Sequence, residues 1–263
     1  MYSLKKINNN QKTTIMNKSI LLLAALMLTT LTHAQWWSEN EKVKGNGNTT
    51  TITRTTGDYD GIKCAGSMDY ILVASTEGNI KLEGEENLLK HIITEVKGNN
   101  LIVKVEKGIN LRPSWGKTIK ITIPFKDISS VSLAGSGDLW NEDVITSTNF
   151  DVSLAGSGDV ILNIEASSIE GSLAGSGDIT LKGKTNNLTI KLAGSGDIHA
   201  FGLQSNHTVV SVAGSGDIQV VSNKSLKARV SGSGDIEYRG NPSKEDTKVS
   251  GSGMEVLVIN QSN

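Results

Sequence analysis

The chain has 263 residues, with 26 basic and 27 acidic side chains, 28 glycines, 3 prolines and a single cysteine. One cysteine excludes a disulfide framework and a cysteine-based metal centre, and a net charge of −1 lacks the basic excess of a nucleic-acid-binding protein. Glycine exceeds the roughly 7 % typical of globular proteins, without the proline that collagen requires.

Residues 1–34 have the features of a secretory signal peptide. Four lysines precede the apolar run 20–28, and Thr32-His33-Ala34 supplies a small-residue cleavage site. The run is about half the ~20 residues that a bilayer-spanning helix needs. We therefore expect cleavage after Ala34 and no membrane span in the exported product. A complete signal peptide also begins at Met16, which is an alternative start.

Residues 35–48 follow the predicted cleavage site and are polar and glycine-rich after Trp36 and Trp37. Such a segment next to a terminus is expected to form a flexible lead. Beyond it, short apolar runs within residues 49–130 predict β-strands. These runs are residues 78–85, 88–96, 101–105 and 118–123, and residues 85–90 could form a short helical turn.

Residues 62–70 (Ile-Lys-Cys-Ala-Gly-Ser-Met-Asp-Tyr) match a motif that recurs later in the chain, with Met68 in place of a glycine. In this alignment Cys64 occupies a position that is Leu or Val in the later copies. We therefore expect Cys64 to be buried and unreactive.

The later motif, Leu/Val-Ala/Ser-Gly-Ser-Gly-Asp, organises residues 131–263. Its first glycines are residues 135, 156, 175, 194, 214, 232 and 251, which are 18 to 21 residues apart. Apolar residues alternate with polar ones on both sides of the motif, which predicts a strand, a sharp corner and another strand. Glycine allows the corner a positive φ. The candidate corner glycines are Gly135, Gly137, Gly156, Gly158, Gly175, Gly177, Gly194, Gly196, Gly214, Gly216, Gly232 and Gly234.

Strands that recur about every 19 residues, with no helical pattern between them, predict an all-β fold: a β-solenoid with its equivalent strands stacked in parallel. Each repeat would form one coil, with equivalent strands ~4.8 Å apart, and the crossover rule favours right-handed winding. A β-propeller blade needs about 40 residues. We predict one β-solenoid domain over residues 49–263, with degenerate coils in 49–130 and regular coils in 131–263.

The serial Ala-Gly-Ser-Gly-Asp motif, together with Tyr59-Asp-Gly-Ile62 and Tyr238-Arg-Gly-Asn-Pro242, resembles the auto-transporter adhesin head, or GIN-domain, family. The resemblance covers about residues 50–255. It implies an all-β, single-stranded, right-handed parallel β-helix and a role in adhesion, in a family common among exported proteins of Bacteroidetes-type bacteria. It implies no catalytic residues.

One aspartate follows each regular glycine corner, and in register these residues would form a ladder at ~4.8 Å, where carboxylates repel by about 1 kcal/mol even in water. The favoured interpretation is that each carboxylate accepts backbone N–H groups of its own corner. The alternative is a structural Ca²⁺ ladder, although one carboxylate per coil is few for an ion that takes six to eight oxygens. Apart from this calcium, no cofactor is expected. The aspartates are Asp138, Asp159, Asp178, Asp197, Asp217 and Asp235.

No pattern in the sequence predicts catalysis. The corner serines lack the spacing of a nucleophile elbow and are interpreted as structural. Only Trp115 and Trp140 in the solenoid region could stack on a sugar. The charged residues that a polysaccharide-cleaving enzyme could use do not form a convincing acid–base pair. These residues are Glu165, Glu170, Lys182, Lys184 and Lys191.

We therefore interpret the protein as an exported, non-catalytic β-solenoid that binds a macromolecule, either a glycan or a protein, at the cell surface or in the envelope. The candidate contact segments are residues 141–149, 185–187 and 204–207. Periplasm, outer-membrane surface and medium all stay open as compartments. Two alternatives remain: a carbohydrate-active enzyme on the same scaffold, and a purely structural envelope component that forms oligomers through open solenoid ends.

Overall fold

The computed structural model describes residues 40–252 and 257–258, and the predicted signal peptide, residues 1–34, lies outside them. Residues 42–263 form one compact unit, which is described here; of the other unit, residues 1–41, only residues 40 and 41 are described. The structure is nearly all β, with 69 % strand and 2 % helix.

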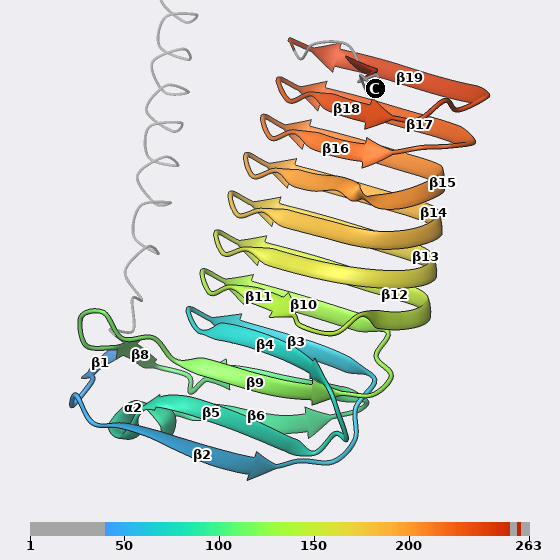
Figure 1. The fold of residues 1–263 in the computed structure, drawn as a ribbon. Coiled ribbons are helices and arrows are strands. Elements are labelled where there is room, and N and C mark those ends of the chain that lie inside the picture. The colour runs from blue at the N-terminus through green and yellow to red at the C-terminus, as the bar shows by residue number, and fades with distance from the viewer. Residues whose placement is uncertain (1–39, 253–256, 259–263) are drawn as a thin grey trace, which may run out of the picture. The chain divides into compact units, whose positions relative to one another are not determined.

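The N-terminal part of the unit contains short strands and one short helix (Figure 1). They are β1 (Glu41–Lys44), β2 (Thr49–Thr55), β3 (Gly61–Gly66), β4 (Asp69–Ala74), β5 (Asn79–Glu85), α2 (Glu86–Leu89), β6 (Ile92–Lys97), β7 (Asn100–Val105), β8 (Ile109–Arg112) and β9 (Lys120–Phe125). The run 88–96 therefore begins in helix α2, and only its later part is a strand.

The remaining strands form the stacked coils. They are β10 (Ser130–Gly135), β11 (Leu139–Asn141), β12 (Ile145–Gly156), β13 (Val160–Gly175), β14 (Ile179–Gly194), β15 (Ile198–Gly214), β16 (Ile218–Val221), β17 (Ser225–Gly232), β18 (Ile236–Arg239), β19 (Lys244–Gly251) and β20 (Leu257–Val258). Figure 1 shows the glycine corners together at one edge of the stack and rounded bends at the other.

The predicted parallel β-solenoid is confirmed, with about six turns that lie ~19 residues apart in the chain. Its register follows the motif: Leu133 pairs with Leu154, which pairs with Leu173, and the corner glycines pair in the same way. Cys64 on β3 pairs with Leu133 and is 2 % exposed, as predicted. Burial raises the pKa of its thiol.

The core is a set of aliphatic columns that run along the stack. Side chains alternate between buried and accessible along each strand because successive residues of a β-strand point to opposite faces. Leu154, Leu173 and Leu192 are at most 2 % exposed, and each coil adds the same type of side chain to the column. Burying one such side chain contributes roughly 1.5–3 kcal/mol, so the columns hold the coils together.

The two glycines of each corner are needed for different reasons. Gly156 has a φ of +145°, which a residue with a side chain rarely adopts. Gly158 has no such φ, but a Cβ there would lie 1.9 Å from the carbonyl oxygen of Gly137 in the preceding coil. The second glycine is therefore required for close stacking of the coils. From the sequence alone, both glycines are expected for their ability to adopt a positive φ, a reason that holds for the first glycine only.

The first part of the unit departs from the expected series of degenerate coils. Strands β3 and β4 form one coil, which pairs in parallel with β10 and β11 on one side and with β7 and β9 on the other. Three pairs, β2–β5, β5–β9 and β6–β7, are antiparallel. The turn at Gly98 explains the last pair, because strands joined by so short a loop can pair only antiparallel.

The expected flexible lead, residues 35–48, also requires correction in its described part. Strand β1 forms a two-stranded sheet with β8. Val43 packs against the core, and the N–H of Gly45 donates to the carbonyl oxygen of Arg112 at 2.8 Å. The packing of Val43 and the backbone hydrogen bonds of β1 and Gly45 therefore hold this segment against the rest of the unit.

Candidate binding groove

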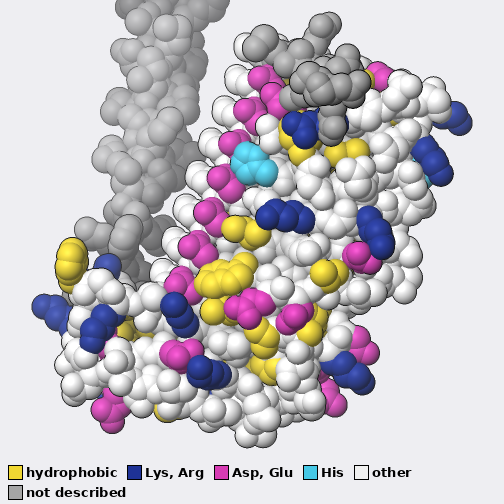
Figure 2. All heavy atoms as spheres, viewed as in Figure 1, with side chains coloured by type: hydrophobic (Ala, Val, Ile, Leu, Met, Phe, Trp, Pro, Cys, Tyr) yellow, Lys and Arg dark blue, Asp and Glu magenta, His cyan; other side chains and the backbone are white. Residues whose placement is uncertain are grey.

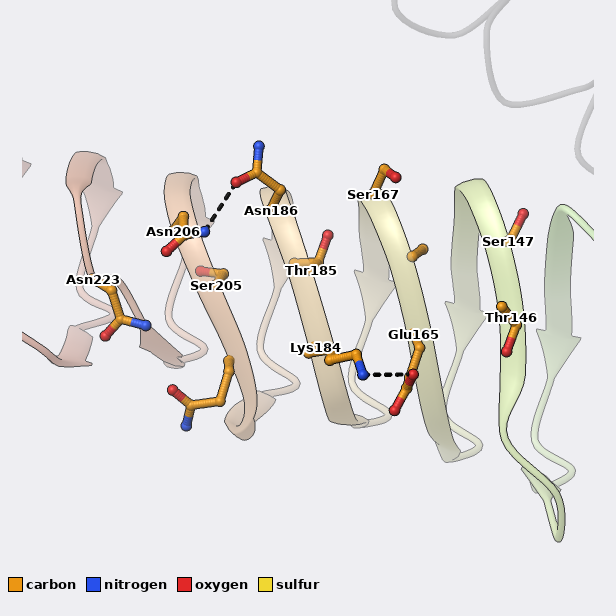
Figure 3. Close-up of a pocket in the computed structure, with 12 residues that line it drawn as sticks. Thr146, Ser147, Glu165, Ser167, Lys184, Thr185, Asn186, Ser205, Asn206 and Asn223 are labelled. Atoms are coloured by element: carbon orange, nitrogen blue, oxygen red, sulfur yellow. Dashed lines mark hydrogen bonds and ion pairs between the residues drawn. The ribbon is translucent and has the colours of Figure 1, made fainter.

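A groove of about 550 Å³ runs along the rounded bends of the coils, at the end of each coil away from the glycine corners (Figures 1 and 3). We call it the bend groove. Most of its lining is hydroxyl or amide side chains. The lining residues are Thr146, Ser147, Glu165, Ala166, Ser167, Lys184, Thr185, Asn186, Gln204, Ser205, Asn206 and Asn223.

Strand register places these residues in rows along the stack. Glu165 pairs with Lys184, which pairs with Gln204, while the next row continues from Thr185 to Ser205. Because equivalent positions recur in each coil, polar residues at the same place in successive repeats must line one continuous surface. A long ligand lying along the groove would meet a new row about every 4.8 Å.

Two polar contacts cross from coil to coil within the groove (Figure 3). The Nζ of Lys184 lies 2.8 Å from Oε2 of Glu165, and Nδ2 of Asn206 donates to Oδ1 of Asn186 at 2.9 Å. The ion pair is solvent-exposed and contributes at most about 1 kcal/mol to stability. The side chains of these two pairs can therefore give up their contacts with each other and form hydrogen bonds with a ligand instead.

Ser205 has a different role from its neighbours because the residue is only 1 % exposed and its hydroxyl has hydrogen-bond partners inside the protein. Its Oγ lies 2.6 Å from Oγ1 of Thr208, and both oxygens lie within hydrogen-bond distance of the carbonyl oxygen of Val221, so one hydroxyl donates to the other and the second donates to this carbonyl. This buried set of hydrogen bonds holds the bend of β15 in place. Ser205 thus supports the floor of the groove.

The sequence-derived contact segments overlap the groove in part. Segments 185–187 and 204–207 contribute Thr185, Asn186, Gln204, Ser205 and Asn206, and segment 141–149 contributes Thr146 and Ser147. Residues 165–167, Lys184 and Asn223 line the groove but lie outside those segments. The signal for residues 165–167 was available, since they lie one repeat of 19 residues before 184–186.

The charged residues considered for catalysis are brought together as ion pairs. Glu165 pairs with Lys184, and Glu170 pairs with Lys191 at 2.5 Å. Lys182 is exposed on β14 and lines no part of the groove. Among the described residues that line the groove, Glu165 is the only carboxylate. A glycoside hydrolase uses two carboxyl groups across the scissile bond, which this lining does not provide.

The aspartate column lies at the opposite edge, along the glycine corners, where Figure 2 shows a line of acidic side chains. The carboxylates from Asp138 to Asp217 each accept the backbone N–H of the aspartate one coil further on, and not an N–H of their own corner as predicted. Oδ1 of Asp138 accepts from Asp159 at 3.1 Å, and Oδ1 of Asp197 accepts from Asp217 at 2.8 Å. Asp159, Asp178 and Asp217 accept in the same way.

The side chains reach along the solenoid axis because the corner N–H groups are already turned toward the preceding coil. For example, the N–H of Ser157 donates to the carbonyl oxygen of Gly135 at 2.9 Å. Bonds from N–H groups to a carboxylate stabilise its charge and offset repulsion along the ladder. Within residues 40–252, no three His, Cys, Asp or Glu side chains gather closely enough to hold a metal ion. The calcium ladder stays a prediction.

A family model described as "Putative auto-transporter adhesin, head GIN domain" matches residues 58–242. The chain belongs to this family. The resemblance that the sequence motifs indicated is therefore confirmed, and the match covers β3 to β18.

Solved structures similar to this GIN domain come from Bacteroides and Parabacteroides species. A putative adhesin from Bacteroides fragilis is 25 % identical with a TM-score of 0.76, and the match covers 82 % of this chain and 100 % of that one. A putative lipid binding protein from Parabacteroides distasonis is 28 % identical with a TM-score of 0.70, over 84 % and 100 % of the two chains. A putative adhesin from Parabacteroides distasonis is 25 % identical, with a TM-score of 0.67 and coverage of 83 % and 100 %.

These likenesses support an adhesin-like module, and family membership supports a cell-surface or exported protein. The proteins named in the similar structures are not described as enzymes. No curated protein matches the chain. In the part of the chain that the structure describes, no helix is both long and apolar enough to span a bilayer.

Proposed function

We propose that this GIN domain is an exported, non-catalytic module that binds a glycan chain in the bend groove. The observation that carries the proposal is the lining itself: rows of hydroxyl and amide side chains at the coil spacing, with one carboxylate among its described residues. Such side chains both donate and accept hydrogen bonds, as sugar hydroxyls do. Export rests on the signal-peptide features of residues 1–34.

The proposal of a non-catalytic role is supported by the way the groove uses its charges. Oε2 of Glu165 lies 2.8 Å from Nζ of Lys184, so the one carboxylate of the described lining is engaged in an ion pair. Glycoside hydrolysis uses a second carboxyl group across the scissile bond, which this lining does not supply. Binding without turnover is therefore the function that the lining supports best.

An array of neutral and acidic oligosaccharides, probed with residues 35–263, tests this proposal. This protein retains the entire compact unit, residues 42–263. We expect capture of an oligosaccharide, with no cleavage product when the captured sugar is incubated with the protein. The double variant Asn186→Ala/Asn206→Ala should weaken binding at least tenfold, because each substitution removes amide hydrogen bonds of about 1 kcal/mol.

A second pair of variants separates the groove from the surface in general. Glu165→Ala/Lys184→Ala removes the ion pair in the groove, and Glu170→Ala/Lys191→Ala removes a similarly exposed pair outside it. Only the first should alter binding. Equal affinity in both variants would refute the groove as the binding site, and release of a cleaved sugar would refute the non-catalytic role.

A further inference from the structure

The loop between β8 and β9 presents a tryptophan to solvent on a tight turn. Trp115 is fully exposed, at 101 % of its reference area. The carbonyl oxygen of Ser114 accepts the N–H of Lys117 at 2.9 Å, and Gly116 has a φ of +73°. A hydrogen bond between the first and fourth residues, with glycine at positive φ in third place, is typical of a type II turn.

This turn is fixed to the body of the unit by a buried carboxylate. Glu85 is 1 % exposed and accepts hydrogen bonds from the N–H and the hydroxyl of Ser114 at 2.8 and 2.5 Å. It also accepts the N–H of Gly47 at 2.6 Å, and Nζ of Lys117 donates to the carbonyl oxygen of Gly47. The hydrogen bonds from Ser114 hold the pKa of Glu85 below its usual value, so the carboxylate stays charged.

The exposure of Trp115 is therefore built into the fold. Packing the indole against the protein would remove apolar area from water. The braced turn instead carries Trp115 with its whole side chain exposed. Single exposed apolar side chains are common on protein surfaces, so Trp115 becomes informative through the charged side chains that lie beside its turn.

Beside the turn, a cleft of about 510 Å³ is lined by three cations, Lys42, Lys44 and Arg112, with Gly45, Pro113 and Ser114. Val43 and Leu111 pack against the core, so strand alternation places the three cations on the outer face of β1 and β8. None of the three forms an ion pair with any residue between 40 and 252.

The acidic groups on the adjoining elements do not neutralise this face. Glu41 lies on β1 but, by strand alternation, on the same side as Val43, away from the two lysines. Glu85 is committed to Ser114 and Gly47, and Glu86 lies at the first residue of α2. Figure 2 shows Lys and Arg side chains together with an apolar side chain over β1 and β8.

We propose that Trp115 and the cations Lys42, Lys44 and Arg112 form a docking surface for anionic lipid headgroups at a membrane surface. An indole prefers the boundary between water and the acyl chains, because its ring is apolar and its N–H is polar. Lys and Arg side chains close to an anionic leaflet are each attracted to it. The surface lies away from the bend groove, so membrane docking is separate from glycan binding.

The test is binding of residues 35–263 to vesicles, measured by co-sedimentation. The probes are vesicles of phosphatidylcholine alone and vesicles that also contain phosphatidylglycerol. The wild type should bind only the phosphatidylglycerol vesicles, and added salt should weaken binding. Lys42→Gln/Lys44→Gln/Arg112→Gln should lower affinity about a hundredfold, and Trp115→Ala about tenfold.

The matched control is Lys182→Gln/Lys224→Gln/Lys227→Gln, which removes three exposed cations from the coils and should leave vesicle binding unchanged. A fluorescence measurement follows Trp115 itself. The emission spectrum of Trp115 is obtained by subtracting the spectrum of Trp115→Phe from that of the wild type. On vesicle binding this emission should shift to shorter wavelength, and brominated acyl chains should quench it. Circular dichroism of each variant confirms that the fold is retained.

Four results would overturn the proposal. They are no binding of the wild type to phosphatidylglycerol vesicles, equal loss in the control variant, no effect of Trp115→Ala, and complete competition by inorganic phosphate, which would indicate a site for free anions. The variant Asn186→Ala/Asn206→Ala should still bind vesicles. This result distinguishes failure of the docking surface from failure of the proposed glycan groove.

Discussion

Oδ1 of Asp159 accepts the backbone N–H of Asp178, the equivalent residue one coil further along the chain, at 3.1 Å. The same bond recurs along the corner edge from Asp138 to Asp217, so each of these aspartates ties its own coil to the next. The column of carboxylates is therefore a hydrogen-bonded element of the stack.

This arrangement predicts different effects for two substitutions of one aspartate. Asp159→Ala leaves the N–H of Asp178 without its acceptor and should lower the free energy of unfolding by about 1–2 kcal/mol. Asp159→Asn keeps an acceptor oxygen and should cost less than half as much. Urea denaturation followed by circular dichroism measures both. Equal loss in the two variants would show that the charge matters and that the hydrogen bond does not.

The calcium alternative predicts a separate, measurable effect. If the carboxylates serve only as acceptors of backbone N–H hydrogen bonds, added calcium should not change the melting temperature of the protein, and a chelator should not lower it. A ligand that binds the folded state would raise stability according to its concentration relative to its dissociation constant. A calcium-dependent rise that disappears in Asp159→Asn would establish the cation ladder instead.

The second corner glycine predicts a large effect of a small side chain. Gly158→Ala would place a Cβ 1.9 Å from the carbonyl oxygen of Gly137, so the two coils must separate. We expect a loss of about 3 kcal/mol or more. Gly57→Ala is the control, because no atom lies within 4 Å of its added Cβ. A similar melting temperature for both variants would contradict the tight stacking of corners.

The buried thiol predicts a dependence of stability on pH. Burial raises the pKa of Cys64 in the folded protein, so above the unfolded value of about 8.5 only the unfolded chain loses this proton. Stability should then fall by about 1.4 kcal/mol per pH unit. Urea midpoints between about pH 8 and pH 9 measure the onset of this slope, which Cys64→Ala should largely remove; nearer pH 10 the tyrosines Tyr59 and Tyr70, whose pKa burial also raises, add to it. An unchanged slope in that variant would assign the effect to other groups.

The regular coils could be predicted from sequence because one motif sets both their period and their register. The pairing of Cys64 with Leu133 follows from aligning two copies of the motif. The antiparallel strands β2, β5 and β6 could not be predicted in this way, since they occur once and no repeated corner specifies their neighbours. Local turns such as that at Gly98 decide their pairing.

The candidate sites were predictable to different degrees. The polar segments that include Asn186 and Asn206 could be found by composition, but the pairing of Glu165 with Lys184 depends on register across the bend. The acceptor role of Asp159 depends on the direction of a side chain that the sequence does not encode locally. The sequence identified Trp115 as a candidate for stacking on a ligand. Its full exposure could not be predicted, because the turn that carries it is held by hydrogen bonds from Ser114 to Glu85, which is distant in the sequence.

The central claim, a glycan-binding bend groove, is tested most directly by a nuclear magnetic resonance titration of isotopically labelled residues 35–263 with an oligosaccharide captured on the array. Every backbone amide then reports on its own surroundings. The account predicts that the largest shifts cluster at residues 146–147, 165–167, 184–186 and 204–206. Shifts centred on the glycine corners or on β1 and β8, with the groove unchanged, would contradict it.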